Sequence, residues 1–177
     1  MSGNGFRVYF RVVQGSIWKG VLMAEQGSNF AVLYVDNGES SLRAFRRACE
    51  DQFRVITASN SIEGLDHLKE HKHEIGVVMA ARCMPIRRGT WLLQRARECV
   101  PQIVRLLASD GCSLVEEEDS LRDGIAEGII PIPWDPPELK MRLHAELQRF
   151  AVRRGGRPVG VKEALSACGN SKRRKLL

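Results

Sequence analysis

Apolar and polar positions follow two alternating patterns through the middle of the chain. Five short, mostly continuous apolar runs occur at residues 30–35, 53–58, 75–79, 103–107 and 129–132. Such runs are typical of strands that are buried on both faces of a sheet. Between and after them, apolar residues recur every three or four positions, which predicts helices. The predicted helices lie near residues 42–49, 62–68, 91–99, 114–125 and 136–150.

Strand and helix therefore alternate five times over about 120 residues. Short strands joined by helices favour parallel strands with right-handed crossovers. The pattern predicts an α/β domain with a doubly wound, five-stranded parallel sheet. In such sheets the functional residues lie at the carboxyl ends of the strands. Here those ends are Asp36-Asn37, Ala80-Ala81, Leu107-Ala108 and Ile132-Pro133.

The two ends of the chain differ from the middle in charge. The whole chain has a net charge of +6, but residues 149–177 carry +8, residues 1–29 carry +2 and the middle is negative. For residues 1–29 a hairpin, an added edge strand or an arm all remain open. Residues 151–177 read as a basic tail that could bind a polyanion. Its candidate residues are Arg153, Arg154, Lys172, Arg173, Arg174 and Lys175.

Composition and motifs narrow the function classes. No apolar run approaches the roughly 20 residues of a membrane span, and we expect a cytoplasmic protein. The five cysteines include no Cys-x-x-Cys pair, which argues against a disulfide framework or a zinc knuckle. Phosphate-loop, dinucleotide and Gly-x-Ser-x-Gly signatures are absent from the sequence, so we expect no enzyme. His67 and His71 lie at helical spacing, but two histidines are too few ligands, and we expect no metal site.

Four segments stand in the order and at the intervals of one known family. They are Val-Leu-Tyr-Val-Asp36-Asn37, Met84-Pro85, Leu106-Leu107-Ala108-Ser109-Asp110 and Pro133-Trp134-Asp135-Pro136-Pro137-Glu138-Leu139. Over residues 30–150 the chain resembles the receiver domain of two-component response regulators. Its Pro-Trp-Asp-Pro ending is similar to receivers found with hydrogenase-type transcription regulators. The resemblance implies a flavodoxin-like receiver fold with N- and C-terminal extensions, and a cis bond between Ile132 and Pro133.

The same resemblance shows where this sequence departs from the family. Working receivers hold Mg²⁺ with an acidic pair and an aspartate, through oxygen ligands. The same aspartate accepts the phosphoryl group, and a Thr/Ser and a Lys bind the phosphoryl oxygens. By position, the acidic pair falls on Asp36 and Asn37, and the acceptor falls on Ala81. The hydroxyl position falls on Leu107, and the lysine position falls on Ile132, just before Pro133. The position of the switching aromatic residue falls on Ile129. Residues 75–85 contain no Asp or Glu, so a shifted alignment restores no acceptor.

The losses predict a degenerate pocket that is not phosphorylated and needs no cofactor. If Leu107 and Ile132 pack together, they would hold the domain in one conformation. The family's usual partner face, on its fourth helix, fifth strand and fifth helix, falls on Leu114, Leu121, Ile125, Lys140 and Arg142. The acidic run at 116–119 beside Lys140 and Arg142 could support a two-fold dimer.

Our leading hypothesis is a non-phosphorylatable receiver that binds protein partners in two-component signalling, namely a sensor kinase, a response regulator or an effector. The alternative is a nucleic-acid-associated regulator that uses the basic tail on a receiver-like scaffold.

Overall fold

A computed structural model describes residues 30–155 of the chain. The predictions for residues 1–29 and for Lys172, Arg173, Arg174 and Lys175 concern residues outside that range.

Five strands and five helices alternate along the described residues. The strands are β1 (Ala31–Val35), β2 (Val55–Ala58), β3 (Ile75–Ala81), β4 (Val104–Ser109) and β5 (Gly128–Pro131). The helices are α1 (Glu39–Cys49), α2 (Ser61–Glu70), α3 (Gly89–Cys99), α4 (Leu114–Arg122) and α5 (Pro136–Arg153). Among these described helices, none has the length and apolar character needed to cross a membrane.

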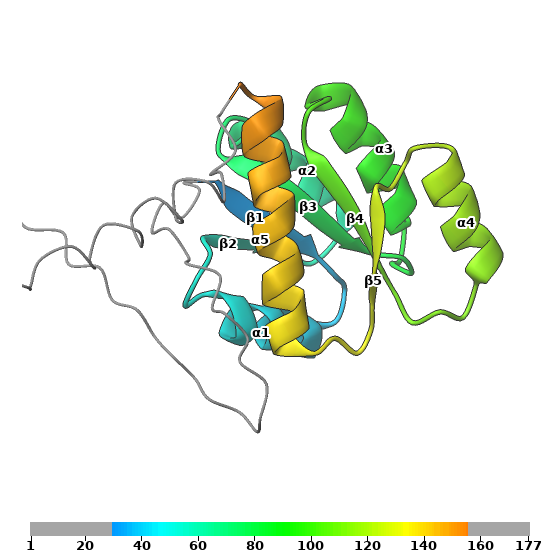
Figure 1. Cartoon of the computed structure of the whole chain (residues 1–177). Helices are drawn as coiled ribbons and strands as arrows, with labels where there is room; N and C mark the ends of the chain where they lie inside the picture. The colour runs from blue at the N-terminus through cyan, green and yellow to red at the C-terminus, as the bar shows by residue number, and fades with distance from the viewer. Residues whose placement is uncertain (1–29, 156–177) are drawn as a thin grey trace, which may run out of the picture. The chain divides into compact units, whose positions relative to one another are not determined.

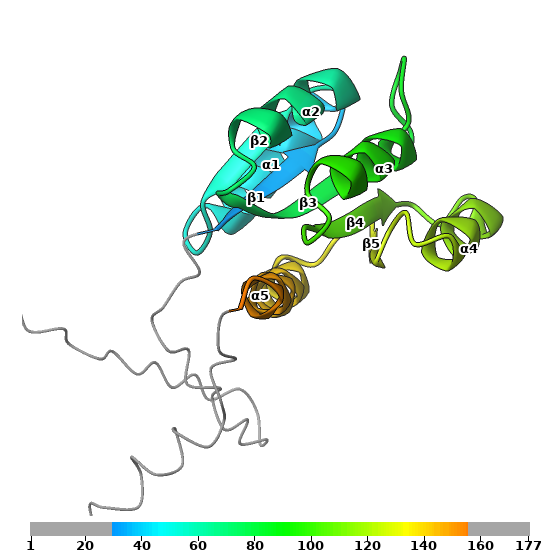
Figure 2. The ribbon, with the colours of Figure 1, turned by 90° about the horizontal axis from the view of Figure 1, so that it is seen from above.

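The strands form one parallel sheet in the order β2-β1-β3-β4-β5. Figure 1 shows the sheet at the centre of the domain, with α4 beside the β5 edge. Seen from above, α5 lies on one side of the sheet and α3 on the other (Figure 2). This is the five-stranded, doubly wound α/β architecture that the hydrophobic pattern predicts, and that prediction is confirmed.

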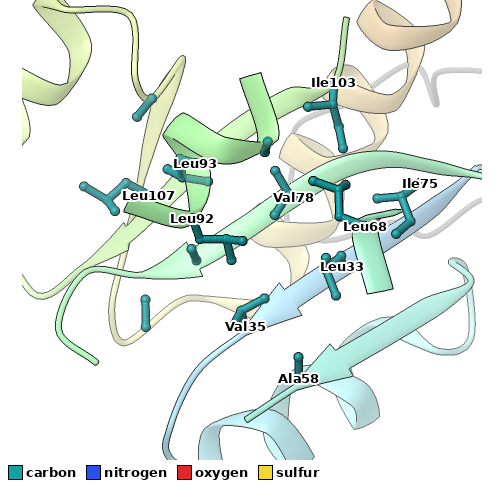
Figure 3. Close-up of a cluster of buried hydrophobic side chains, with 14 of the residues drawn as sticks. Leu33, Val35, Ala58, Leu68, Ile75, Val78, Leu92, Leu93, Ile103 and Leu107 are labelled. Carbon is teal, nitrogen blue, oxygen red and sulfur yellow. The ribbon is translucent and has the colours of Figure 1, made fainter. Parts of the chain in front are cut away.

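The sheet separates two apolar layers. One lies under α2 and α3 and includes Leu33, Val78, Leu92 and Leu107 (Figure 3). The other lies under α1 and α5 and includes Tyr34, Phe45 and Phe150, among others. All five residues of β1 and all seven of β3 are buried, because helices cover both faces of these central strands. The carboxyl ends of β1, β3 and β4 are therefore fixed against a dry core.

Helix ends explain the differences between predicted and observed boundaries. Asn60 is the N-cap of α2, where its side chain accepts hydrogen bonds from the backbone N–H groups of Ile62 and Glu63. Helix α4 stops at Arg122, before the predicted end near residue 125, because Gly124 has a φ of 66° and turns the chain. Helix α5 continues to Arg153, beyond the predicted end at residue 150.

Candidate functional site

The retained carboxylate of Asp36 is already engaged inside the protein. Asp36 follows β1 and is buried. Its Oδ2 accepts a hydrogen bond of 2.5 Å from the Tyr34 hydroxyl, and its Oδ1 accepts one of 2.7 Å from the backbone N–H of Gly38. Burial, followed by the contact with Asp36, raises the pKa of Tyr34 well above its ordinary value. The neighbouring Asn37 is exposed. The acidic pair of a working receiver is thus reduced to one carboxylate that bonds its own chain.

The acceptor position is occupied by a small apolar residue under a tightly packed helix start. Ala81 ends β3 and is buried, and its register partner on β4 is Ala108. Helix α3 begins directly on top of it. A Cβ added to Gly89 would lie 2.2 Å from the backbone oxygen of Ala81, so only glycine fits there. The methyl group of Ala81 offers no oxygen to a phosphoryl group or to a metal ion.

Leu107 and Ile129 stand at the positions that the resemblance assigns to the hydroxyl and the aromatic residue of a working receiver. They are Cα partners in the β4–β5 ladder, and Ile129 packs against the cluster that contains the fully buried Leu107. Ile132 packs against the opposite layer, under α1 and α5. The expectation that Leu107 packs with Ile132 was therefore wrong. Residues 129 and 132 are an odd number of positions apart, so side chains that alternate along an extended chain face opposite sides.

The bond between Ile132 and Pro133 is cis, as predicted. It leads into Trp134, whose ring packs edge-on against Tyr34 at a centroid distance of 5.4 Å. Ile132, at the lysine position, is therefore followed by residues that pack against β1. Its own apolar side chain brings no cation to the pocket.

The cation at this end of the sheet is Arg82, which directly follows Ala81. Its side chain is only 8% exposed. Its Nε donates to Ser109 Oγ at 3.2 Å, and its Nη atoms donate to Asp110 at 3.2 Å and to Glu116 at 3.0 Å. It also contacts the Cys112 sulfur. Arg82 thus ties the end of β3 to the β4–α4 loop and to the first turn of α4.

The hydrogen bonds of Arg82 favour the charged forms of Arg82, Asp110 and Glu116. Although burial opposes a charged guanidinium, the hydrogen bonds to Glu116 and Asp110 raise the pKa of Arg82. Hydrogen bonds from Cys112, followed by the one from Arg82, lower the pKa of Asp110 to about 2. Hydrogen bonds from Arg88 and then Arg82 also lower the pKa of Glu116. At neutral pH the buried cation Arg82 therefore faces two charged carboxylates, those of Asp110 and Glu116.

The predicted partner-face residues lie in α4, in α5 and in the connection between α4 and β5, but they differ in exposure. The side chains of Leu114 and Leu121 on α4 are exposed. Ile125 is half-buried and packs against the core layer that also contains Leu107. A groove of about 300 Å³ lies between β5 and α5. Met141, which is 69% exposed, and Arg142 both line that groove.

The charged residues expected to pair across a dimer are bonded within the chain. Lys140 Nζ donates to Asp51 at 2.8 Å, so it faces α1 and not α4, contrary to the prediction. Arg142 donates to Glu146 at 2.7 Å. Glu116 bonds Arg82 and Arg88. Lys140, Arg142 and Glu116 are therefore already paired within the chain.

Two residues assigned to the basic tail belong to the folded domain instead. Arg153 lies in α5 and donates to Glu127 at 3.2 Å. Arg154 caps α5, donates to the backbone oxygen of His73 at 2.9 Å and lies over the Phe30 ring. The helix outlasts its predicted end because these arginines find carboxylate, carbonyl and aromatic partners. The prediction that these two residues lie in a free tail was wrong.

One feature of the sequence that lies outside the receiver motifs indicates the position of Arg82. A charged residue stands directly after the seven-residue apolar strand Ile75–Ala81. Acidic residues follow β4 at Asp110 and at 116–119. Because parallel strands end at one edge of a sheet, a cation after β3 and anions after β4 are placed close together.

Comparison with known proteins agrees with the fold. The chain is 32% identical over 111 residues to the hydrogenase transcriptional regulatory protein HoxA of Cupriavidus necator, and 30% identical over 145 residues to HoxA of Bradyrhizobium diazoefficiens. The matches cover 61% and 78% of this chain, but only 22% and 28% of those proteins. No family model matches the chain.

Solved structures give the same result at lower identity. A response regulator receiver domain protein from Clostridium thermocellum superposes with a TM-score of 0.66 at 22% identity, covering 70% of this chain and 98% of that one. An adenylate cyclase structure from Rhodopirellula baltica gives 0.68 at 24% identity, covering 78% and 98%. The receiver domain of an HD domain-containing protein from Pseudomonas fluorescens gives 0.66 at 23% identity, covering 72% and 93%. Strand order, motif order and these likenesses together identify residues 30–155 as a domain with the receiver fold of response regulators.

Proposed function

We propose that this domain is a receiver that cannot be phosphorylated and that acts in two-component signalling by binding protein partners, without catalysis. It serves as a cytoplasmic adaptor, decoy or constitutive regulator. The observation that carries the proposal is the replacement of the acceptor by Ala81, with Arg82 bonded to the β4–α4 loop. A phosphoryl group needs an acceptor oxygen and a metal ion held by several oxygen ligands, and this pocket offers a single engaged carboxylate.

Ser109 carries a hydroxyl at the end of β4, but this hydroxyl is committed to other contacts. It is buried, and its hydroxyl donates to Glu117. The same oxygen accepts from Arg82 at 3.2 Å. Both the hydrogen and a lone pair of this hydroxyl are therefore used within the domain, which argues against a transferred acceptor.

The pair Leu107 and Ile129 supports a fixed conformation. In a working receiver a hydroxyl and an aromatic side chain at these two positions respond to the phosphoryl group. Here both are aliphatic and pack in one apolar layer. The Arg82 contacts hold the first turn of α4 from the pocket side. The partner face, which begins with α4, is thus presented without a phosphorylation signal.

The apolar surface around α4 and α5 supports partner binding. Leu114, Leu121 and Met141 are large apolar side chains exposed to solvent, and Met141 lines the groove between β5 and α5. Exposed apolar groups around a groove are typical of protein-binding surfaces. Arg142, which lines the groove, is paired with Glu146 within the chain, and we propose that recognition there depends mainly on apolar contact.

Two experiments test the proposal. In the first, the full chain is incubated with Mg²⁺ and acetyl phosphate and its intact mass is measured, with a phosphorylatable receiver as the positive control. We expect no added phosphoryl group. A phosphorylated species whose acid-stability is that of an acyl phosphate would contradict the proposal.

In the second, sedimentation equilibrium compares the parent chain with Met141→Glu and with Ile62→Glu, an exposed apolar residue on α2 as the matched control. Self-association that Met141→Glu weakens and Ile62→Glu does not would identify a second copy as the partner. A monomeric parent chain would exclude a second copy of the chain as the partner. Self-association that both variants leave unchanged would contradict the use of this face.

A further inference from the structure

Five residues with metal-ligating side chains lie along one face of α2 and the turn that follows it. They are Glu63, His67, Glu70, His71 and Glu74. Successive residues of this set are four, three, one and three positions apart. Residues at such intervals lie on one side of a helix, as the apolar residues of an amphipathic helix do. Here every position in the stripe carries a nitrogen or oxygen ligand.

Three of these side chains converge. One ligand atom each from His67, Glu70 and His71 lie within 4.8 Å of one another. The two imidazole rings are nearly parallel, with an interplanar angle of 28° and centroids 6.3 Å apart. Both histidines are about one-third exposed, so an ion can reach them from solvent. Two imidazoles and one carboxylate, with an open fourth position, are a ligand set that zinc accepts.

The two outer glutamates are placed to orient the histidines. Glu63 Oε2 accepts hydrogen bonds from the backbone N–H and the hydroxyl of Ser59, at 2.8 and 2.6 Å. Its other oxygen lies 3.8 Å from His67 Nε2.

At the other end, Glu74 Oε2 bonds Arg54 at 2.5 Å, while its Oε1 lies 3.8 Å from His71 Nδ1. Each outer carboxylate is thus held by one oxygen, and its other oxygen lies within 3.8 Å of a ring nitrogen. Metal-bound histidines commonly have such a carboxylate beside the nitrogen that does not bind the metal.

We infer that α2 carries a site for a divalent transition metal of the zinc class. His67, Glu70 and His71 bind the ion, and Glu63 and Glu74 are positioning residues that fix the two imidazoles. Imidazole ligands select zinc, nickel or copper over magnesium and calcium, which prefer oxygen ligands alone. His67 and His71 alone are too few ligands for a metal site, and Glu70 supplies the third ligand. The site shares no residue with the degenerate phosphorylation pocket, so it stands independently of the proposed function.

Isothermal titration of the full chain with Zn²⁺ tests this inference. The parent chain is compared with the double variant His67→Asn/His71→Asn, and with His73→Asn as the matched control, an exposed histidine outside the stripe. We expect one saturable site in the parent and in His73→Asn, and its loss in the double variant. Glu63→Gln and Glu74→Gln should each weaken binding about 10- to 100-fold. All substituted side chains are at least partly exposed, and circular dichroism checks that each variant is folded.

Equal zinc binding by the parent and the double variant would overturn the site, since the ion would then bind elsewhere, for example at exposed thiols. Absence of saturable binding in the parent would overturn it as well. Unchanged affinity in both glutamine variants would refute the positioning role of Glu63 and Glu74. Imidazole resonances give a site-resolved check, because Zn²⁺ should shift those of His67 and His71 and leave those of His73 in place.

Discussion

Replacing Arg82 with methionine tests whether a buried cation holds the β4–α4 loop. Methionine retains an unbranched apolar stem and removes the guanidinium. The bond from Arg82 Nε to Ser109 Oγ joins two buried side chains. A hydrogen bond with a charged donor contributes about 1.5–3 kcal/mol in such a place. The carboxylates of Asp110 and Glu116 are exposed enough to be hydrated when the arginine is lost. We therefore expect Arg82→Met to lower the free energy of unfolding by about 1.5–3 kcal/mol.

Arg88 provides a matched control on the same acceptor. Its Nη1 donates to the second carboxylate oxygen of Glu116 at 2.7 Å, but its side chain is 67% exposed. Exposed ion pairs contribute little because water and salt screen them. Arg88→Met should therefore change stability far less than Arg82→Met, although both remove an arginine bonded to Glu116.

Urea unfolding of the two single variants, of Ser109→Ala and of the Arg82→Met/Ser109→Ala double variant measures these terms. The double-mutant cycle should give a coupling of about 1.5–3 kcal/mol between Arg82 and Ser109. Amide hydrogen exchange should also accelerate in the loop at residues 110–113 in Arg82→Met. Equal stability of Arg82→Met and Arg88→Met, with no coupling to Ser109, would refute the structural role given to Arg82.

Three further substitutions probe the pocket and its loops. Leu107→Thr should lower the free energy of unfolding by about 1–3 kcal/mol, because it buries a hydroxyl in an apolar layer, and mass spectrometry should still detect no phosphorylation; urea unfolding that matches the parent would contradict this. Ile86→Asn should raise the melting temperature, because Ile86 has a φ of 70° and a branched residue there costs about 1–2 kcal/mol; a lower melting temperature would count against strain. The pKa of Asp110 is lowered from 3.8 to about 2 in the folded protein. Its contribution to stability is therefore present above about pH 4 and lost as the pH falls toward 2. Asp110→Asn should flatten the stability profile in that window, and an unchanged acid limb would contradict the assignment.

The fold followed from the sequence because one pattern determines it. Continuous apolar runs mark strands that are buried on both faces, and the interposed amphipathic helices must cover both sides of the sheet. The ends of elements were less predictable, since they depend on local contacts. Helix α5 continues to Arg153 because Glu127 and an aromatic ring receive the arginines at its end.

The sequence predicts which phosphorylation residues the candidate site lacks, but it does not predict which side chains fill the pocket in their place. The absence of Asp and Glu from residues 75–85 is visible in the sequence and predicts the loss of the acceptor. What fills the pocket depends on side-chain directions. The pairing of Leu107 with Ile129, and not with Ile132, follows from strand register. The contacts of Arg82 and the pairing of Lys140 with Asp51 depend on where long flexible side chains lie, which sequence spacing does not specify.

The central claim is that this receiver fold no longer senses a phosphoryl group. Beryllofluoride with Mg²⁺ mimics that group, and backbone amide NMR of the full chain reports its binding residue by residue. The account predicts that amide peaks near Asp36, Ala81 and Leu107 stay in place as both ligands are added. Concerted, saturable shifts of those peaks at low millimolar ligand would contradict it and show that the pocket still binds an anion and a metal.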